Sequence, residues 1–318
     1  MNFGESIKKE IIGKPVRESH CKKAFLAGIL RGAGALYSGD DGIGLLVKLP
    51  DEETAMTVGG LLDALYGYEI REITVAEDRL NKKDRFTVYI GGDRAIDILE
   101  DLEIFSETEE GLAVNFDFFG KIAEKDCCLR SFFRGLFVSA GSCTVPSEKG
   151  VKTGYHLELS FSRAETASAS ADKLSTNGIS VRITRRKDSF VVYIKSVEEI
   201  ENFLAFLPAP VSVLKLTDIA IKKELLNDSN RRKNCDLGNV GRQIEAVEKQ
   251  ISAIEIIERE RGIDFLKPEL KTVAVSRKEN PDETLSELAE RLNISKSCLN
   301  HRLRKIISIA KETEIDHG

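Results

Sequence analysis

The feature that most constrains the fold of this chain is an internal repeat, in which one pattern recurs at a constant offset. The segment FLAGILRGAG at residues 25–34 aligns with FFRGLFVSAG at residues 132–141. Each segment is followed by a turn and a strand, a helix, two strands separated by a charged turn, and a closing helix. These later helices are predicted at residues 52–65, 94–102, 163–176 and 197–206. A doubled helix-strand-strand-helix-strand-strand-helix unit is therefore predicted over residues 21–207.

Small side chains dominate the opening helix of the first copy, which contains Ala24, Ala27, Gly28, Gly32 and Gly34. A glycine inside a helix costs about 1 kcal/mol relative to alanine, so several of them require a compensating contact. Close approach to another helix backbone would provide one. We therefore expect the two opening helices to pair along a pseudo-twofold axis, with the two sheets beside them.

A second pattern lies near the C-terminus, where apolar residues recur at helical spacing in two short segments. The first segment contains Leu285, Leu288, Ala289 and Leu292, and the second contains Leu299, Leu303 and Ile306. Between them, Asn293 tolerates the left-handed backbone conformation that ends many helices, and Ser295 is a suitable N-cap for the next one. This is the pattern of a helix-turn-helix.

The second helix of this pair is basic. Residues 291–311 contain no acid and six basic residues, namely Arg291, Lys296, Arg302, Arg304, Lys305 and Lys311. Double-stranded DNA is the partner that this asymmetry favours, over a solvated basic face or a protein-docking surface. The residues expected to bind it are Ser295, Lys296, Ser297, Asn300, His301, Arg302, Arg304 and Lys305. The residues nearest the helix start are expected to read bases, namely Lys296, Ser297, Asn300 and His301. The three that follow, Arg302, Arg304 and Lys305, are expected to contact phosphates.

Two further helices are predicted between the repeats and the helix-turn-helix, at residues 214–226 and 240–261. The polar segment 228–234 between them contains Arg231, Arg232 and Lys233, which either contact phosphates or form a solvated connector. The apolar stripe of the helix at 240–261 either packs on the helix-turn-helix or forms the seam of a homodimer.

The length of 318 residues is sufficient for two or three domains. We expect an α+β fold, in which a duplicated N-terminal domain with a pseudo-twofold axis precedes an all-α helix-turn-helix domain. The predicted divisions are 1–20, an N-terminal helix; 21–107 and 108–210, the two repeats; 211–270, a helical bridge; and 271–318, the DNA-binding domain. The net charge of −5 argues against indiscriminate coating of nucleic acid, so DNA contact should be local.

Several classes of protein and site are not indicated. No segment approaches the roughly 18 unbroken apolar residues of a membrane span, and no apolar run near the N-terminus fits a signal peptide, so a cytoplasmic, nucleoid-associated location is expected. The six cysteines are scattered and the four histidines isolated, so no metal site and no cofactor are expected. Phosphate-loop, HExxH and dinucleotide motifs are absent from the sequence, and no catalytic residue is assigned.

The doubled unit resembles the two-repeat LAGLIDADG homing endonucleases, whose motif occupies the opening helices. Its nine positions correspond to LAGILRGAG at 26–34 and FRGLFVSAG at 133–141. In that family the eighth position is an acid that holds the catalytic metal, whereas here it is Ala33 and Ala140. A methyl group cannot ligate a hard cation, so the resemblance implies that the fold is retained without the nuclease. Asp40, Asp41 and Glu148 follow the motifs in matched turns, where acids are common for backbone reasons.

The combination of a degenerate LAGLIDADG pair with a C-terminal helix-turn-helix resembles the WhiA family of bacterial regulators. Two further stretches carry this resemblance, NRRKNCDLGN at 230–239 and SKSCLNHRLRKI at 295–306. It implies sequence-specific DNA binding and transcription regulation, with roles in cell division, chromosome segregation and, where it occurs, sporulation. Two alternatives stay open at this point: an active metal-dependent endonuclease, and a scaffold that binds proteins of the division machinery.

Overall fold

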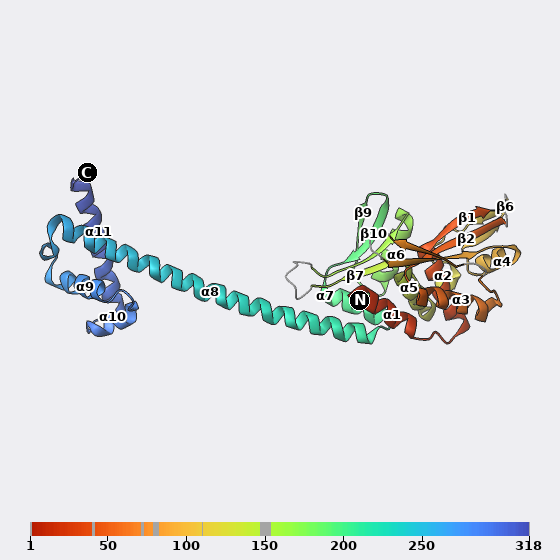
Figure 1. The fold of residues 1–318 in the computed structure, drawn as a ribbon, viewed down its shortest axis with the longest axis horizontal. Coiled ribbons are helices and arrows are strands. Elements are labelled where there is room, and N and C mark those ends of the chain that lie inside the picture. The colour runs from red at the N-terminus through yellow and green to blue at the C-terminus, as the bar shows by residue number, and fades with distance from the viewer. Residues whose placement is uncertain are drawn as a thin grey trace. The chain divides into compact units, whose positions relative to one another are not determined.

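The structure is a computed structural model that describes residues 2–39, 42–70, 73–78, 83–109, 111–146 and 154–317. The chain forms two compact units, 1–223 and 224–318. Figure 1 shows the mixed helix and sheet of the first unit and the all-helical second unit.

The first unit contains the doubled fold that the repeat predicts. The first copy comprises α2 (Ser19–Ala33), β1 (Gly34–Gly39), β2 (Gly42–Leu49), α3 (Glu52–Tyr66), β3 (Ile73–Asp78), β4 (Lys83–Ile90) and α4 (Asp93–Asp101). The second comprises α5 (Asp126–Ala140), β7 (Gly141–Thr144), β8 (His156–Phe161), α6 (Ala164–Thr176), β9 (Arg182–Arg186), β10 (Ser189–Ile194) and α7 (Val197–Phe206). The two sheets have the equivalent orders β1-β2-β4-β3 and β7-β8-β10-β9, and all their pairings are antiparallel. The predicted α+β class is confirmed.

Alternation along the strands determines which sheet face packs on the helices. In β8, Leu157, Leu159 and Phe161 are buried. In the pairing of β8 with β10, Leu159 lies opposite Val192 and Leu157 lies opposite Ile194. Val192 and Ile194 are also buried. Since residues two apart on a strand share a face, these side chains form one apolar surface.

The paired helices α2 and α5 form the centre of this unit (Figure 1). A Cβ atom added to Gly28 would lie 2.1 Å from the carbonyl oxygen of Phe132, and one added to Gly135 would lie 2.1 Å from the carbonyl oxygen of Phe25. The predicted close backbone approach is therefore present, and both helices contribute to it.

Further elements outside the repeat also belong to this unit. Helix α1 (Phe3–Gly13) begins with a capping box of Asn2 and Glu5 and buries Ile7 and Ile11. A hairpin of β5 (Phe105–Thr108) and β6 (Gly111–Val114) and the short helix η1 (Lys121–Ala123) connect the two copies. The sequence pattern did not predict the hairpin.

The two helices predicted between 214 and 261 are a single helix, α8 (Pro210–Arg261), so the predicted separation of these helices by residues 228–234 is wrong. Residues 226–237 contain neither proline nor glycine, and nothing in them forces a break. Local polar contacts also support this stretch, including the ion pair between Arg231 and Asp228 one turn apart. Gly262, with a φ of 73°, ends the helix where predicted.

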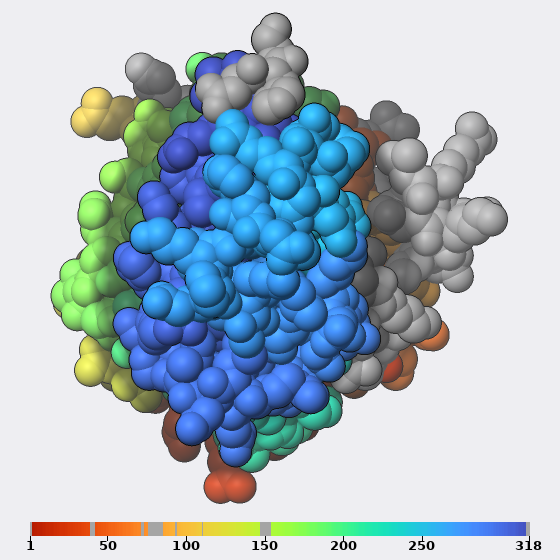
Figure 2. All heavy atoms as spheres, turned by 90° about the vertical axis from the view of Figure 1, so that its left-hand side faces the viewer, coloured from red at the N-terminus to blue at the C-terminus, as the bar shows by residue number. Residues whose placement is uncertain are grey.

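The second unit contains the end of α8 with η2 (Ile263–Phe265), α9 (Pro268–Glu279), α10 (Leu285–Arg291) and α11 (Lys296–His317). Its core includes Ile254, Ile257, Leu288, Leu299, Leu303 and Ile306, each at most 1% exposed. The buried faces predicted for the last two helices are thus confirmed. Figure 2 faces this unit, whose light-blue and dark-blue segments lie against one another.

Among the helices of the described residues, none is both long and apolar enough to cross a membrane.

Candidate nucleic-acid interface

The turn between α10 and α11 fixes the start of α11. Asn293 has a φ of 52°, the left-handed conformation expected for it. The amide of Ile294 then donates to the carbonyl of Ala289 at 3.0 Å, and the hydroxyl of Ser295 accepts from the amide of Cys298 at 3.1 Å. Ser295 is therefore the N-cap of α11, as predicted.

A buried arginine holds the segment that precedes this pair of helices. Arg277 of α9 is fully buried, and its Nη1 donates to the carbonyl of Glu283 at 2.8 Å and, more weakly, to those of Asn280 and Pro281 at 3.4 Å. Burial lowers its pKa, and the nearby Glu283 opposes this effect. The sequence does not single out Arg277, because an arginine late in a helix is ordinarily a solvated residue.

The start of α11 presents an uncovered basic surface. Lys296, Ser297, His301, Arg304 and Lys305 are exposed. Within the described part of the chain, none of the three basic residues among them forms an ion pair. Their charges are thus available to an anionic partner.

Arg291, which belongs to the same basic set in the sequence, differs. Its Nε lies 3.0 Å from Oε1 of Glu283, and the hydrogen bonds from Arg291 hold the pKa of that carboxyl below its usual range. Arg291 therefore neutralises an acid of its own chain.

The remaining predicted residues divide between two sides of α11. Residues 297, 301 and 304 follow helical spacing and lie opposite the buried Leu299 and Leu303. Half-buried Arg302 lines a hollow of about 630 Å³, which Cys298, His301, Lys305 and residues of η2 and α9 also line. Asn300 is half-buried on the other flank. The helix thus offers one outward row with polar residues on either side of it.

The three basic residues predicted in the connector are exposed on α8 instead. Arg231 forms an ion pair with Asp228, whereas Arg232 and Lys233 point into solvent.

The ends of α2 and α5 correspond to the catalytic end of the LAGLIDADG motif. Ala33 and Ala140 are the last residues of these helices and are half-buried. Arg31 lies nearby and donates to the carbonyl of Asn115 at 3.1 Å. Asp40, Asp41 and Glu148, the acids of the following turns, lie outside the described residues.

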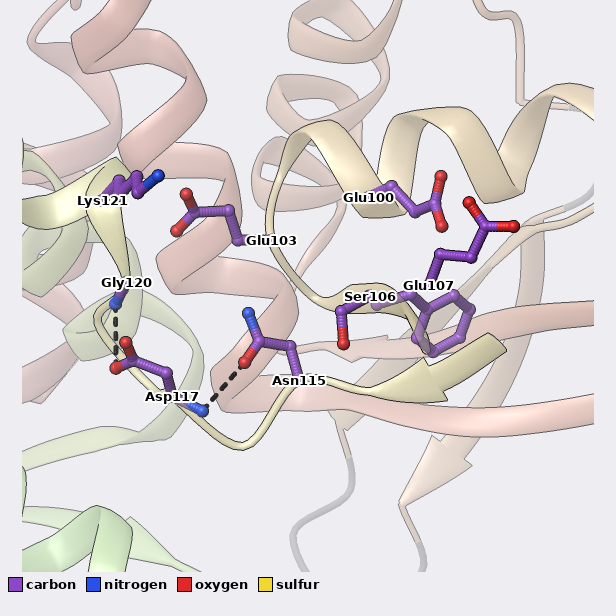
Figure 3. Close-up of a pocket in the computed structure, with 9 residues that line it drawn as sticks. Glu100, Glu103, Ser106, Glu107, Asn115, Asp117, Gly120 and Lys121 are labelled. Atoms are coloured by element: carbon purple, nitrogen blue, oxygen red, sulfur yellow. Dashed lines mark hydrogen bonds between the residues drawn. The ribbon is translucent and has the colours of Figure 1, made fainter. Parts of the chain in front are cut away.

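An acidic hollow of about 450 Å³ lies beside the β5-β6 hairpin, and Figure 3 shows Glu100, Glu103, Glu107 and Asp117 around it. Two of these acids accept backbone hydrogen bonds: Asp117 from the amide of Gly120 and Glu103 from that of Ile122, both at 3.1 Å. Its acidic lining makes this hollow unsuitable for a phosphate backbone.

The cysteines that look scattered along the sequence are not all scattered in space. One cluster among the described residues has the side chains and spacing that could hold a metal ion: His20, Cys21, Cys127 and Cys128, whose ligand atoms lie within 4.8 Å of one another. The spacing of these residues along the chain does not predict the cluster. The internal repeat does provide a signal, because the offset that aligns the two copies also relates His20 to Cys127 and Cys21 to Cys128.

Comparison with known proteins agrees with this architecture. Three family models match: the WhiA N-terminal LAGLIDADG-like domain at 19–105, the WhiA LAGLIDADG-like domain at 129–226 and the WhiA C-terminal HTH domain at 229–310. Relatives named probable cell division protein WhiA include one from Caldicellulosiruptor saccharolyticus, 32% identical over 98% of this chain and 95% of its own, and one from Clostridium novyi, 30% identical over 98% of each.

The fold also matches solved structures. The full-length DUF199/WhiA crystal structure from Thermotoga maritima has a TM-score of 0.58 at 24% identity and covers 98% of this chain and 99% of its own. A structure of the N-terminal LAGLIDADG domain of DUF199/WhiA has a TM-score of 0.51 at 22% identity and covers 65% of this chain and 90% of its own. The three models together and the full-length relatives show that this chain belongs to the WhiA family.

Proposed function

We propose that this protein is a sequence-specific DNA-binding regulator of transcription that acts in bacterial cell division, and that its LAGLIDADG-like domain is not a nuclease. Cell division is the role given in the names of its relatives. Chromosome segregation and sporulation are further roles implied by the family resemblance, and a nucleoid location follows from DNA binding.

The observation that carries the proposal is the exposed basic start of α11. The left-handed backbone of Asn293 and the N-cap Ser295 fix the position of this helix start. A second helix of a helix-turn-helix enters the major groove with its N-terminal residues toward the base edges. Among the described residues, an acid of the protein pairs with Arg291 but none with Lys296, Arg304 or Lys305. This difference favours DNA over a merely solvated face.

We assign base reading to Lys296, Ser297, Asn300 and His301, which occupy the first turns of α11. Arg302, Arg304 and Lys305 lie further along the helix, where phosphate contacts are expected, and Ser295 orients the helix start. Arg232 and Lys233 of α8 are proposed as additional phosphate contacts, together with Arg231 when its ion pair with Asp228 opens.

Loss of nuclease activity is supported by Ala33 and Ala140 at the ends of α2 and α5. Neither side chain offers the oxygen ligand that Mg²⁺ or Mn²⁺ requires. Supercoiled plasmid carrying a bound site, incubated with the protein and either ion, should remain supercoiled. Nicked or linear product that disappears with the ion would overturn this part of the proposal.

A homodimer or a protein partner on α8 is a second proposal, supported by Leu237, Val240 and Ile244. These side chains are 70%, 51% and 55% exposed and are spaced three and four residues apart, as in a helix-helix seam. Comparing the sedimentation of the full chain with that of its L237E/I244E variant tests whether these side chains form a dimer interface.

The DNA proposal is tested by mapping bound sites across the genome and measuring gel-shift affinity for a mapped site. The double variant R302A/R304A should no longer bind the mapped sites and should no longer support normal cell division. If division is normal while DNA binding is lost, the protein-scaffold alternative is correct instead.

A further inference from the structure

A cluster of three thiols and one imidazole lies where the paired helices of the two repeats begin. Nδ1 of His20 lies 3.1 Å from Sγ of Cys128 and 3.3 Å from Sγ of Cys21. Cys127 completes the group, in which all four ligand atoms lie within 4.8 Å of one another. Cys21 and Cys128 are buried, whereas His20 and Cys127 are exposed.

The cluster is divided evenly between the repeats. His20 and Cys21 lie in the first turn of α2, and Cys127 and Cys128 lie in the first turn of α5. Ala33 and Ala140 lie at the other end of the same helices, twelve residues beyond Cys21 and Cys128 respectively. At 1.5 Å per residue this separation is about 18 Å, so the cluster is distinct from the end of the helices that corresponds to the catalytic end of the LAGLIDADG motif.

The donor set is that of a zinc site. Thiolate and imidazole ligands suit Zn²⁺, and three cysteines with one histidine form a common closed tetrahedral shell. Zn–S bonds of about 2.3 Å in a tetrahedron separate neighbouring ligand atoms by about 3.8 Å. The two nitrogen–sulfur separations, 3.1 and 3.3 Å, are shorter than this, in the direction that the shorter Zn–N bond requires, and all four ligand atoms lie within 4.8 Å of one another, so small side-chain rotations would admit the ion.

Positive charge lies beside the cluster, although burial raises the pKa of the Cys21 and Cys128 thiols in the ion-free protein. The starts of two helices converge on the cluster, and each carries a partial positive charge. The guanidinium of Arg134 interacts electrostatically with Cys21 and is fixed by donation to the carbonyls of Ile11 at 3.0 Å and Lys14 at 2.7 Å. The exposed His20 and Cys127 leave the ion a path from solvent.

We infer that His20, Cys21, Cys127 and Cys128 bind one Zn²⁺ per chain, which links the two repeats at the start of their paired helices. Three thiols release their protons to solvent as the ion binds, and no group is oxidised or reduced. Two ligands from each repeat make the ion a cross-link between helices that are distant in the sequence.

Cobalt titration of the reduced, metal-stripped full chain tests the inference. Binding of Co²⁺ at one equivalent should produce the thiolate-to-cobalt charge-transfer band and the d–d bands of a tetrahedral site, and Zn²⁺ should displace both. Zn²⁺ should also raise the melting temperature of the first unit.

The double variant H20A/C127S removes the two exposed ligands, leaves the buried Cys21 and Cys128 in the core, and should abolish both bands. C235S, which removes an exposed thiol of α8 outside the cluster, is the control and should bind like the parent.

Absence of the bands in the parent, or equal bands in H20A/C127S, would overturn the proposal. So would isolation of a disulfide within the cluster that forms in the presence of saturating Zn²⁺. Circular dichroism of each variant confirms that a negative result comes from a folded protein.

Discussion

Gly28 and Gly135 occupy equivalent positions in α2 and α5, and each faces a backbone carbonyl of the opposite helix at a distance that leaves no room for a methyl group. This reciprocal contact joins the two repeats.

Substitution of Gly28 or Gly135 by alanine should therefore separate the helices. The added Cβ would meet a carbonyl oxygen at 2.1 Å, and overpacking of this kind typically costs about 1–3 kcal/mol. Chemical denaturation of the full chain measures the change in unfolding free energy. Gly60 is the matched control because it is exposed in α3 with nothing within 4 Å, so G60A should stabilise by up to about 1 kcal/mol. Equal effects at Gly28 and Gly60 would contradict the close approach.

Replacement of Arg277 by methionine should destabilise the second unit by about 2 kcal/mol or more. The variant keeps an apolar volume but leaves the carbonyl of Glu283 without its donor at 2.8 Å. Exchange of backbone amides in 280–292, followed by mass spectrometry, should speed up. K278M removes an exposed charge from the same helix and should leave the exchange rates of these amides unchanged. Equal exchange rates in R277M and K278M would argue against a specific role for Arg277.

Cys143 should resist alkylation in the folded protein. Burial raises the pKa of this thiol to about 12, whereas Cys235 is exposed. At pH 8, iodoacetamide should label Cys235 rapidly and Cys143 only after unfolding. Because the folded-state pKa is above the unfolded value of about 8.5, this group lowers stability as the pH rises from there toward about 12. Equal labelling rates for Cys143 and Cys235 would show that the edge of the sheet at β7 is accessible to the reagent in the folded protein.

Asn300→Ala should relax the preference for one base pair and leave non-specific affinity nearly unchanged. An asparagine that reads adenine through two hydrogen bonds contributes about 1–3 kcal/mol of discrimination. Competition gel shifts with single-base variants of a mapped site measure it. S308A lies two turns further along α11 and serves as the control; a uniform decrease in affinity for all sites in N300A would reassign Asn300 to a structural role.

The repeat could be predicted from the sequence because one constant offset relates helices, strands and turns alike. The helix-turn-helix could be predicted because Asn293 and Ser295 have strong local preferences at a turn and a cap. In each case local preference and tertiary packing agree.

Predictions failed where the deciding interaction was absent from the local sequence. Polar composition at 228–234 suggested a connector, although no residue there breaks a helix and Asp228 supports Arg231 within it. The group of His20 with Cys128 arises only when two distant helix starts meet. Arg277 gave no signal, because its acceptors are the carbonyls of a turn.

The salt dependence of DNA binding tests the central claim most directly. Affinity of the full chain for a mapped site is measured over a range of salt concentrations, alongside R304A/K305A and the control R242A/K249A, which removes the same charge from α8. We predict that R304A/K305A flattens the slope of log affinity against log salt by about 0.9 for each phosphate that the variant no longer neutralises, while the control keeps the parent slope. Identical slopes for all three proteins would show that α11 does not lie on the DNA backbone.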